Sequence, residues 1–265
     1  MKRTYAILIA GITGVLILSG YGALADNGHM SVLVRNSGYD ITLTGSEDLR
    51  SGTTGRLTFL ITKNGIPQDI EQDLRSLHVV LSSADREDLF HTMTVSRSGM
   101  GMYSVDHAFT RTGPYRVWME ISNAGGNMHH GDTADLIAYQ DVTVAGTSVQ
   151  QQTLVRTQEV TAGSLIVSLA HEPLRSGESS ALTYTLKDAS GSLVPLMHDG
   201  TMFALVGEDF SSFGHGHFAS SPDGLSATLT KTFSSPGSYA LWTEVYVVND
   251  GQLQQVIVPF SLTVL

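Results

Sequence analysis

Apolar and polar residues alternate with a period of two along many short segments, and Gly, Asn, Asp and Ser separate these segments. Such alternation places successive side chains on opposite faces of an extended strand. It predicts strands at 40–44, 56–62, 76–81, 102–109, 115–121 and 136–144, and again at 164–170, 180–187, 201–206, 226–233, 239–247 and 255–264. Beyond the N-terminal segment a helical period of 3.6 is missing, and residues 70–77 can form one helical turn at most. The predicted fold class is therefore all-β.

One stretch of the chain occurs twice. The segment from Phe109 to Glu120 recurs 124 residues later, from Phe233 to Glu244, with Phe, Gly, Tyr, Trp and Glu at equal spacing. Leu-Arg-Ser-Gly at 49–52 also recurs at 174–177. A repeat that extends over separate segments indicates one domain used twice. We predict domains at 30–146 and 158–265, joined by a polar, Gln-rich linker at 147–157.

The repeated stretch has the pattern of a turn that leads into a strand. A Phe ends one strand, Gly and Pro shape the turn, and a Tyr enters the next strand. Gly-x-Tyr at this place resembles the tyrosine corner of immunoglobulin-like sandwiches, in which the Tyr hydroxyl bonds to the backbone a few residues upstream. Two positions later Val117 and Leu241 stand where antibody domains have Cys, so packing replaces the disulfide. The resemblance implies two tandem immunoglobulin-like antiparallel β-sandwiches.

The N-terminal segment precedes both predicted sandwiches. Lys2 and Arg3 come before an apolar run, and Ala-Leu-Ala follows at 23–25. This pattern is typical of a secretory signal peptide at 1–25, with cleavage after Ala25. The alternative is an uncleaved membrane anchor, because residues 5–24 are long enough to span a bilayer. Both interpretations place the rest of the chain outside the cytoplasm, in the periplasm, at the cell surface or in the medium.

Charge and composition exclude several function classes. The formal net charge is −10, and the basic residues are scattered along the chain. Nucleic acid and anionic lipid are therefore poor partners. The chain has no Cys, which excludes thiol redox chemistry. It also lacks a Gly-x-Ser-x-Gly elbow and a phosphate-binding Gly loop before a helix, so we predict that it is not an enzyme.

Histidine and methionine are the candidate metal ligands. His215 and His217 are two residues apart, so on an extended segment both side chains point the same way. Their equivalents at the offset of 124 are His91 and Met93. Imidazole suits copper in general, and a soft thioether favours Cu(I). This pairing therefore predicts copper as the bound ion.

Further possible ligands occur elsewhere in the chain, which has 10 His and 9 Met. We expect His215 and His217 to be partly exposed near a loop, with Met197 or His198 as the additional ligand. The other candidates are His78, Met100, His107, Met102, Met128, His129 and His130. The alternative is that the Met side chains pack in cores, as Met often does, while the His side chains cap loops.

A longer pattern brings these motifs together. In the second half it consists of Asp209, Phe210, Phe213, His215, His217, Phe233, Gly237, Tyr239, Leu241 and Trp242, and in the first half of Asp85, His91, His107, Phe109, Gly113, Tyr115 and Trp118. The pattern resembles a family of secreted bacterial and archaeal immunoglobulin-like domains that are often associated with heavy-metal handling. The resemblance implies a metal role for the His residues. Phe218 and Met93 depart from it, because Pro and His are usual there.

Two function classes remain open. The first is a secreted or cell-surface, non-enzymatic protein that binds or delivers copper through His and Met. The second is a structural or adhesive module of a surface assembly, with a protein partner and no metal. Glu120 and Glu244, one per domain, are expected to be exposed strand residues or salt-bridge partners. Convergence of His and Met side chains on one side of each domain would favour the first class.

Overall fold

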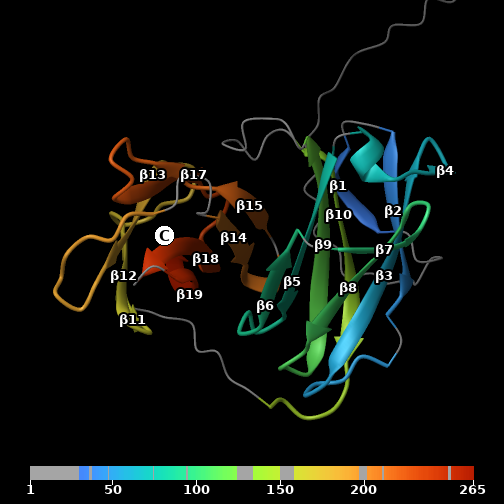
Figure 1. The fold of residues 1–265 in the computed structure, drawn as a ribbon, viewed down its shortest axis with the longest axis horizontal. Helices are drawn as coiled ribbons and strands as arrows, with labels where there is room; N and C mark the ends of the chain where they lie inside the picture. The colour runs from blue at the N-terminus through green and yellow to red at the C-terminus, as the bar shows by residue number, and fades with distance from the viewer. Residues whose placement is uncertain are drawn as a thin grey trace, which may run out of the picture.

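The computed structural model describes residues 30–35, 38–46, 48–73, 75–93, 95–123, 134–149, 158–196, 202–210, 212–249 and 252–265. In these residues the regular structure is β-strand apart from two short 3₁₀ turns, η1 (Ile70–Asp73) and η2 (Glu208–Phe210). The strands form two antiparallel sandwiches in tandem (Figure 1). The predicted all-β, immunoglobulin-like class is confirmed.

The first sandwich consists of two sheets. Its strands are β1 (Ser31–Arg35), β2 (Tyr39–Gly45), β3 (Thr54–Lys63), β4 (Ile66–Pro67), β5 (Arg75–Ser83), β6 (Leu89–Thr92), β7 (Ser96–Gly99), β8 (Met102–Ala108), β9 (Gly113–Asn123) and β10 (Ala134–Val144). One sheet has the order β1-β10-β9-β5-β6, and the other has β2-β3-β8-β7 with β4 paired to β3. Inward side chains of both sheets, such as Phe59, Tyr103 and Val117, form one buried core.

The second sandwich repeats this plan, except that its first strand joins the opposite sheet. Its strands are β11 (Glu159–Ala162), β12 (Leu165–Ala170), β13 (Ser179–Lys187), β14 (Met202–Gly207), β15 (Phe213–His217), β16 (Ala219–Ser220), β17 (Ser226–Thr232), β18 (Gly237–Asn249) and β19 (Gln252–Val264). The sheets have the orders β11-β12-β13-β17-β16 and β15-β14-β18-β19. Their inward side chains, including Tyr184, Leu241 and Phe260, form a separate core.

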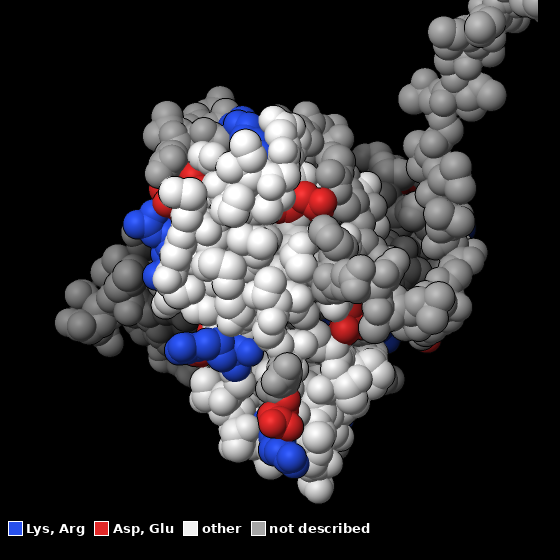
Figure 2. Space-filling model, turned by 90° about the vertical axis from the view of Figure 1, so that its right-hand side faces the viewer, with Lys and Arg blue, Asp and Glu red and all other residues white. Residues whose placement is uncertain are grey.

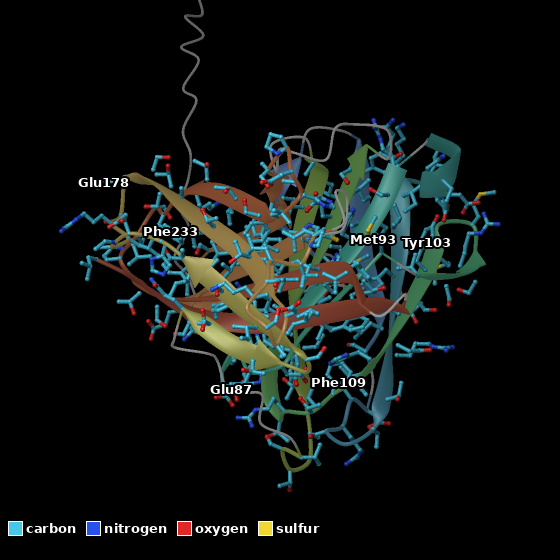
Figure 3. All side chains as sticks on the ribbon, turned by 60° about the vertical axis from the view of Figure 1, so that its left-hand side comes forward. Glu87, Met93, Tyr103, Phe109, Glu178 and Phe233 are labelled. Carbon is cyan, nitrogen blue, oxygen red and sulfur yellow. The ribbon has the colours of Figure 1, made fainter. Side chains whose placement is uncertain are left out.

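Both tyrosine corners are present. The Tyr239 hydroxyl donates to the carbonyl of Ser235 at 2.8 Å, and the Tyr115 hydroxyl lies 3.3 Å from the carbonyl of Arg111. Each acceptor is four residues upstream, as the sequence pattern predicts. The first corner differs in its hydrogen bonds, because the Tyr115 hydroxyl donates its proton to the carboxylate of Asp88 and accepts from the amide of Arg111 at 3.0 Å. The preceding Phe of each repeat packs edge-on against its Tyr; Figure 3 labels both, Phe109 and Phe233.

The predicted strands match β2, β3, β5, β8, β9, β10, β12, β13, β14, β17, β18 and β19, and the single helical turn matches η1. The strands that pattern reading missed are β1, β4, β6, β7, β11, β15 and β16, most of them short strands at sheet edges. Short strands show too few alternations to be recognised from sequence. The predicted signal segment at 1–25 and linker residues 150–157 lie outside the described residues; residues 147–149 belong to no strand.

The two sandwiches pack face to face through one sheet each. The outer faces of β5 and β9 meet those of β14 and β18, with β6 and β15 at the centre of Figure 1. The buried residues of this interdomain seam are Val80, Trp118, Ala204, Val206, Ala240 and Trp242, with Leu89, Tyr139, Phe210 and Phe213 packed against them. Trp118 stacks on Phe213 with ring centroids 4.6 Å apart. The Arg86 guanidinium also donates to the carbonyl of Ser238 at 2.9 Å.

The seam explains why two strands are buried on both faces. Every residue of β14 is buried, as are the last seven of the nine residues of β5.

On the face of the molecule that Figure 2 shows, acidic and basic side chains are scattered among uncharged ones. In the described part of the chain, no helix has the length and apolarity needed to cross a membrane.

Candidate metal centre

Three histidines converge at the interdomain seam. His78 comes from β5, His91 from β6 and His215 from β15. One ring nitrogen of each lies within 4.8 Å of the others. The ring centroid of His215 is 4.8 Å from those of both His78 and His91. Two sandwiches thus contribute to one cluster, whereas convergence within each domain was the arrangement considered from sequence.

Strand register brings the three rings together. His91 pairs with Val80 of β5, and His215 pairs with Ala204 of β14. Val80 and Ala204 are both seam residues, so their cross-strand partners also face the seam. His78 lies two residues before Val80 and shares its face.

The second ring nitrogen of each histidine has a polar neighbour. His215 Nδ1 lies 3.1 Å from Glu120 Oε2, and His91 Nδ1 lies 3.3 Å from Glu244 Oε2. A carboxylate can only accept, so Nδ1 carries the proton and Nε2 presents its lone pair. His78 Nε2 lies 3.3 Å from the Ser76 hydroxyl, which can donate or accept. Metal-binding His residues typically have such outer partners, which orient the ring and fix its tautomer.

One pair of inward nitrogens has the spacing of two ligands of a single ion. His91 Nε2 and His78 Nδ1 are 3.5 Å apart. Nitrogens bound to one ion at 2.0–2.1 Å are separated by about 3.3 to 3.5 Å, so this pair already has ligand spacing. His215 Nε2 is buried and has no hydrogen-bond partner among the described residues. An unsatisfied buried polar atom costs about 1–3 kcal/mol, and a bound cation would remove that cost.

Burial keeps the rings in the form that ligates. It lowers the pKa of His78 to about 3, with a further contribution from His215. Burial also lowers the pKa of His215 well below its ordinary value, with His91 as the next cause. Both rings are therefore neutral at neutral pH, which a metal ligand requires. Burial raises the pKa of Glu120, although His78 and two other histidines act in the opposite direction.

The structure corrects the expected setting of His215. The residue was expected to be partly exposed near a loop, but it is 8% exposed in the middle of β15. Three residues of the first sandwich, Glu120, His78 and His91, lie against it. His217 lies at the end of the same strand, half-buried, and interacts electrostatically with His78 and His215. Met197 and His198, the expected additional ligands, lie outside the described residues.

Two other candidates lie apart from the cluster. Met93, which Figure 3 labels, follows the end of β6. The residue is 41% exposed. His107 is buried on β8, packs against Phe90 and Phe109, and has its Nε2 3.4 Å from an Asp88 carboxylate oxygen. These contacts give His107 a role in the packing of the first sandwich.

Glu120 and Glu244 are not exposed strand residues. Their side chains are 13% and 14% exposed, and each pairs with a His of the other sandwich. The alternative expectation, that they are ion-pair partners, agrees with these contacts. From the sequence, His78 was only one of several further candidate ligands. Glu120 and Glu244 were not assigned to the metal site. The available signal was the apolar Trp two positions before each Glu, which indicates that this strand face is covered as well.

A cavity of about 290 Å³ lies beside the cluster at the seam. Its walls come from β6 of the first sandwich and from β14, β18 and β19 of the second. The lining residues are Leu89, Phe90, His91, Met202, Phe203, Ala204, Trp242, Thr243, Glu244 and Ile257. Since His91 and Glu244 belong to both the cavity and the cluster, the cavity borders the candidate metal centre.

Comparison with known sequences gives limited information. A family described as a domain of unknown function (DUF8832) matches residues 33–134, which lie in the first sandwich. No curated protein matches the chain at a significant level.

Solved structures with detectable similarity include three that illustrate the range of matches. A putative membrane anchored protein from Corynebacterium diphtheriae shares 10% identity with a TM-score of 0.29, over 84% of this chain and 58% of that one. The Escherichia coli adhesin FdeC shares 16% with a TM-score of 0.24, over 89% and 66%. The outer capsid protein Hoc of bacteriophage RB49 shares 16% with a TM-score of 0.24, over 86% and 70%. This chain spans less than two thirds of the first two. At these TM-scores the matches carry no functional argument.

Proposed function

We propose that this protein is a secreted or cell-surface, non-enzymatic metal-binding protein that holds a copper ion between its two sandwiches. The ligands are His78, His91 and His215. One observation carries the proposal: ring nitrogens of three histidines, drawn from both sandwiches, converge within 4.8 Å in a buried site. The Nε2 atom of His215 supports it, because this atom is buried without a hydrogen-bond partner among the described residues and can therefore bind an ion.

The donor set favours a first-row transition metal. Imidazole suits copper, zinc, iron and nickel, whereas calcium and magnesium prefer oxygen. Two carboxylates, Glu120 and Glu244, stand directly behind two of the rings and balance the positive charge of a buried ion. Copper is preferred to zinc because the chain is rich in Met and has no Cys.

The second candidate is an interaction module whose seam binds no ion. The reciprocal contacts of Glu120 and Glu244 favour it, since they link the sandwiches without any ion. The two candidates differ in one measurable property, which is whether the seam takes up a metal.

The test is a titration of the purified chain with Cu(I), Cu(II) and Zn(II) in separate experiments. We expect one ion per chain, and we expect His91→Asn and His215→Asn each to weaken binding by at least about 100-fold. His171→Ala is the matched control, because His171 lies outside the seam, with Nδ1 2.8 Å from the carbonyl of Glu172. Circular dichroism would check that each variant is folded. Equal binding by all variants, or no binding by the wild type, overturns the proposal in favour of the interaction module.

A further inference from the structure

The His–Glu contacts of the seam follow an approximate internal two-fold. His91 and His215 are equivalent in the repeat, and so are Glu120 and Glu244, both at the offset of 124. Each His contacts the Glu of the other sandwich, at 3.3 Å and 3.1 Å. Such reciprocal contacts, in which equivalent residues exchange partners, are typical of an isologous interface, as in symmetric dimers.

This two-fold assigns a counterpart to His78. The residue 124 positions later is Met202. Strand register agrees, because His78 pairs with Glu120 between β5 and β9 while Met202 pairs with Glu244 between β14 and β18. Met202 also lies two residues before the seam residue Ala204, as His78 lies two before Val80. His78 faces the cluster from one side, so Met202 faces it from the other.

Burial of Met202 supports this placement. Met202 is 6% exposed. Even so, it belongs neither to the core of either sandwich nor to the apolar cluster of the seam, as these are defined by the described residues. It lines the cavity together with His91 and Glu244. Met202 is buried outside the apolar clusters and lines the same cavity as His91 and Glu244, so its sulfur is available to bind an ion there.

We propose that the Met202 thioether is the fourth ligand, which completes a His₃Met site selective for Cu(I). Each sandwich then supplies two ligands, His78 and His91 from the first and His215 and Met202 from the second. Soft thioether ligands select Cu(I), whereas Zn(II) gains little from them. The inference rests on the proposed metal function and adds the fourth ligand and the oxidation state.

Two neighbouring side chains are the alternative fourth ligands. Met93 forms the His-x-Met motif with His91, but it is 41% exposed beyond the end of β6. His217 is the cross-strand partner of Met202, and its charge contributes to lowering the pKa of His78. It does not belong to the group of three histidines whose ligand atoms lie within 4.8 Å of one another. Both serve as controls.

The experiment compares Met202→Leu with Met93→Leu and His217→Ala in competition with a chromophoric Cu(I) chelator, and in separate Zn(II) titrations. Loss of an outer-shell partner typically costs 10–100-fold in metal affinity, so loss of a direct ligand should cost at least as much. We expect Met202→Leu to weaken Cu(I) binding by at least about 10-fold, with Zn(II) affinity unchanged. Met93→Leu and His217→Ala should bind Cu(I) like the wild type.

X-ray absorption provides a second readout that is independent of affinity. The Cu(I) form of the wild type should show a sulfur scatterer that Met202→Leu lacks. If Met202→Leu retains both sulfur and affinity, or if Met93→Leu or His217→Ala loses Cu(I) instead, this inference is wrong while the three-histidine site stands. If His91→Asn and His215→Asn also bind normally, the proposed function itself fails.

Discussion

Glu120 of the first sandwich accepts a hydrogen bond from His215 of the second, with 3.1 Å between the carboxylate oxygen and Nδ1. The two residues are 95 positions apart in sequence. The contact has a counterpart in which Glu244 and His91 exchange these roles. Each carboxylate thus reaches across the seam to orient a ring that belongs to the other sandwich.

The first prediction concerns these carboxylates. Glu120→Gln and Glu244→Gln keep the shape of the side chain but remove its charge, so the rings lose basicity and fixed orientation. Each substitution should weaken copper binding by about 10-fold, the lower end for a lost outer-shell partner. The two losses should be similar, because the two-fold makes the positions equivalent. Competition titration measures both, with the exposed Glu178→Gln as control. Affinities equal to that of the wild type would contradict the assigned role.

The second prediction concerns the seam. Val206 is completely buried there, so Val206→Asp places a carboxylate in an apolar contact between the sandwiches. An unpaired buried charge costs several kcal/mol, which separation of the sandwiches would relieve. Small-angle X-ray scattering should show a larger radius of gyration, while circular dichroism still reports β-structure.

Leu193→Asp provides the control for this measurement, because Leu193 is 45% exposed. That variant should keep the radius of gyration of the wild type. The separated Val206→Asp variant should also lose copper affinity, since its ligands no longer converge. A compact Val206→Asp variant would show that the seam tolerates the charge.

The third prediction is a pH dependence of stability from Asp88. Burial alone would raise its pKa, but hydrogen bonds from His107, Tyr115 and the amide of Thr110 outweigh burial and lower the pKa to about 2. A carboxyl with a depressed folded pKa stabilises the fold above its unfolded pKa near 3.9 and loses that contribution as pH falls towards 2. Asp88→Asn should therefore lower the free energy of unfolding at pH 7 by about 1–2 kcal/mol, allowing for partial solvent screening.

Denaturant unfolding at pH 7, 4 and 2.5 measures this difference. The gap between wild type and Asp88→Asn should be largest at pH 7 and should shrink between pH 4 and pH 2.5. The control is Asp141→Asn, which removes an exposed partner of Arg116 and should cost no more than about 1 kcal/mol. A gap that stays constant with pH would show that Asp88 acts through shape and not through charge.

Much of the fold was predictable because its signals are local. Alternation in 115–121 and 239–247 predicts the strands that became β9 and β18, and Gly-x-Tyr predicts their corners. The offset of 124 predicts that the two sandwiches share one plan. These inferences need only neighbouring residues and a count along the chain.

The site was only partly predictable because it depends on how two folded units meet. His91 and His215 were selected from their repeated spacing, but the third ring, His78, carries no local motif. Glu120 shares its strand face with Arg116 and Trp118, a mixture of charged and apolar residues that does not reveal the second sandwich packed against it. Alternation reports which residues share a face; it does not report what covers that face.

The covalent link between the two sandwiches has a consequence for dilution. In a dimer of separate subunits, a two-fold site falls apart when the protein concentration drops below the dissociation constant. Here both halves belong to one chain, and a short connection can give an effective concentration in the millimolar range. The interface contacts are therefore independent of how much protein is present. A site divided between two sandwiches would remain assembled at concentrations at which unlinked copies would separate.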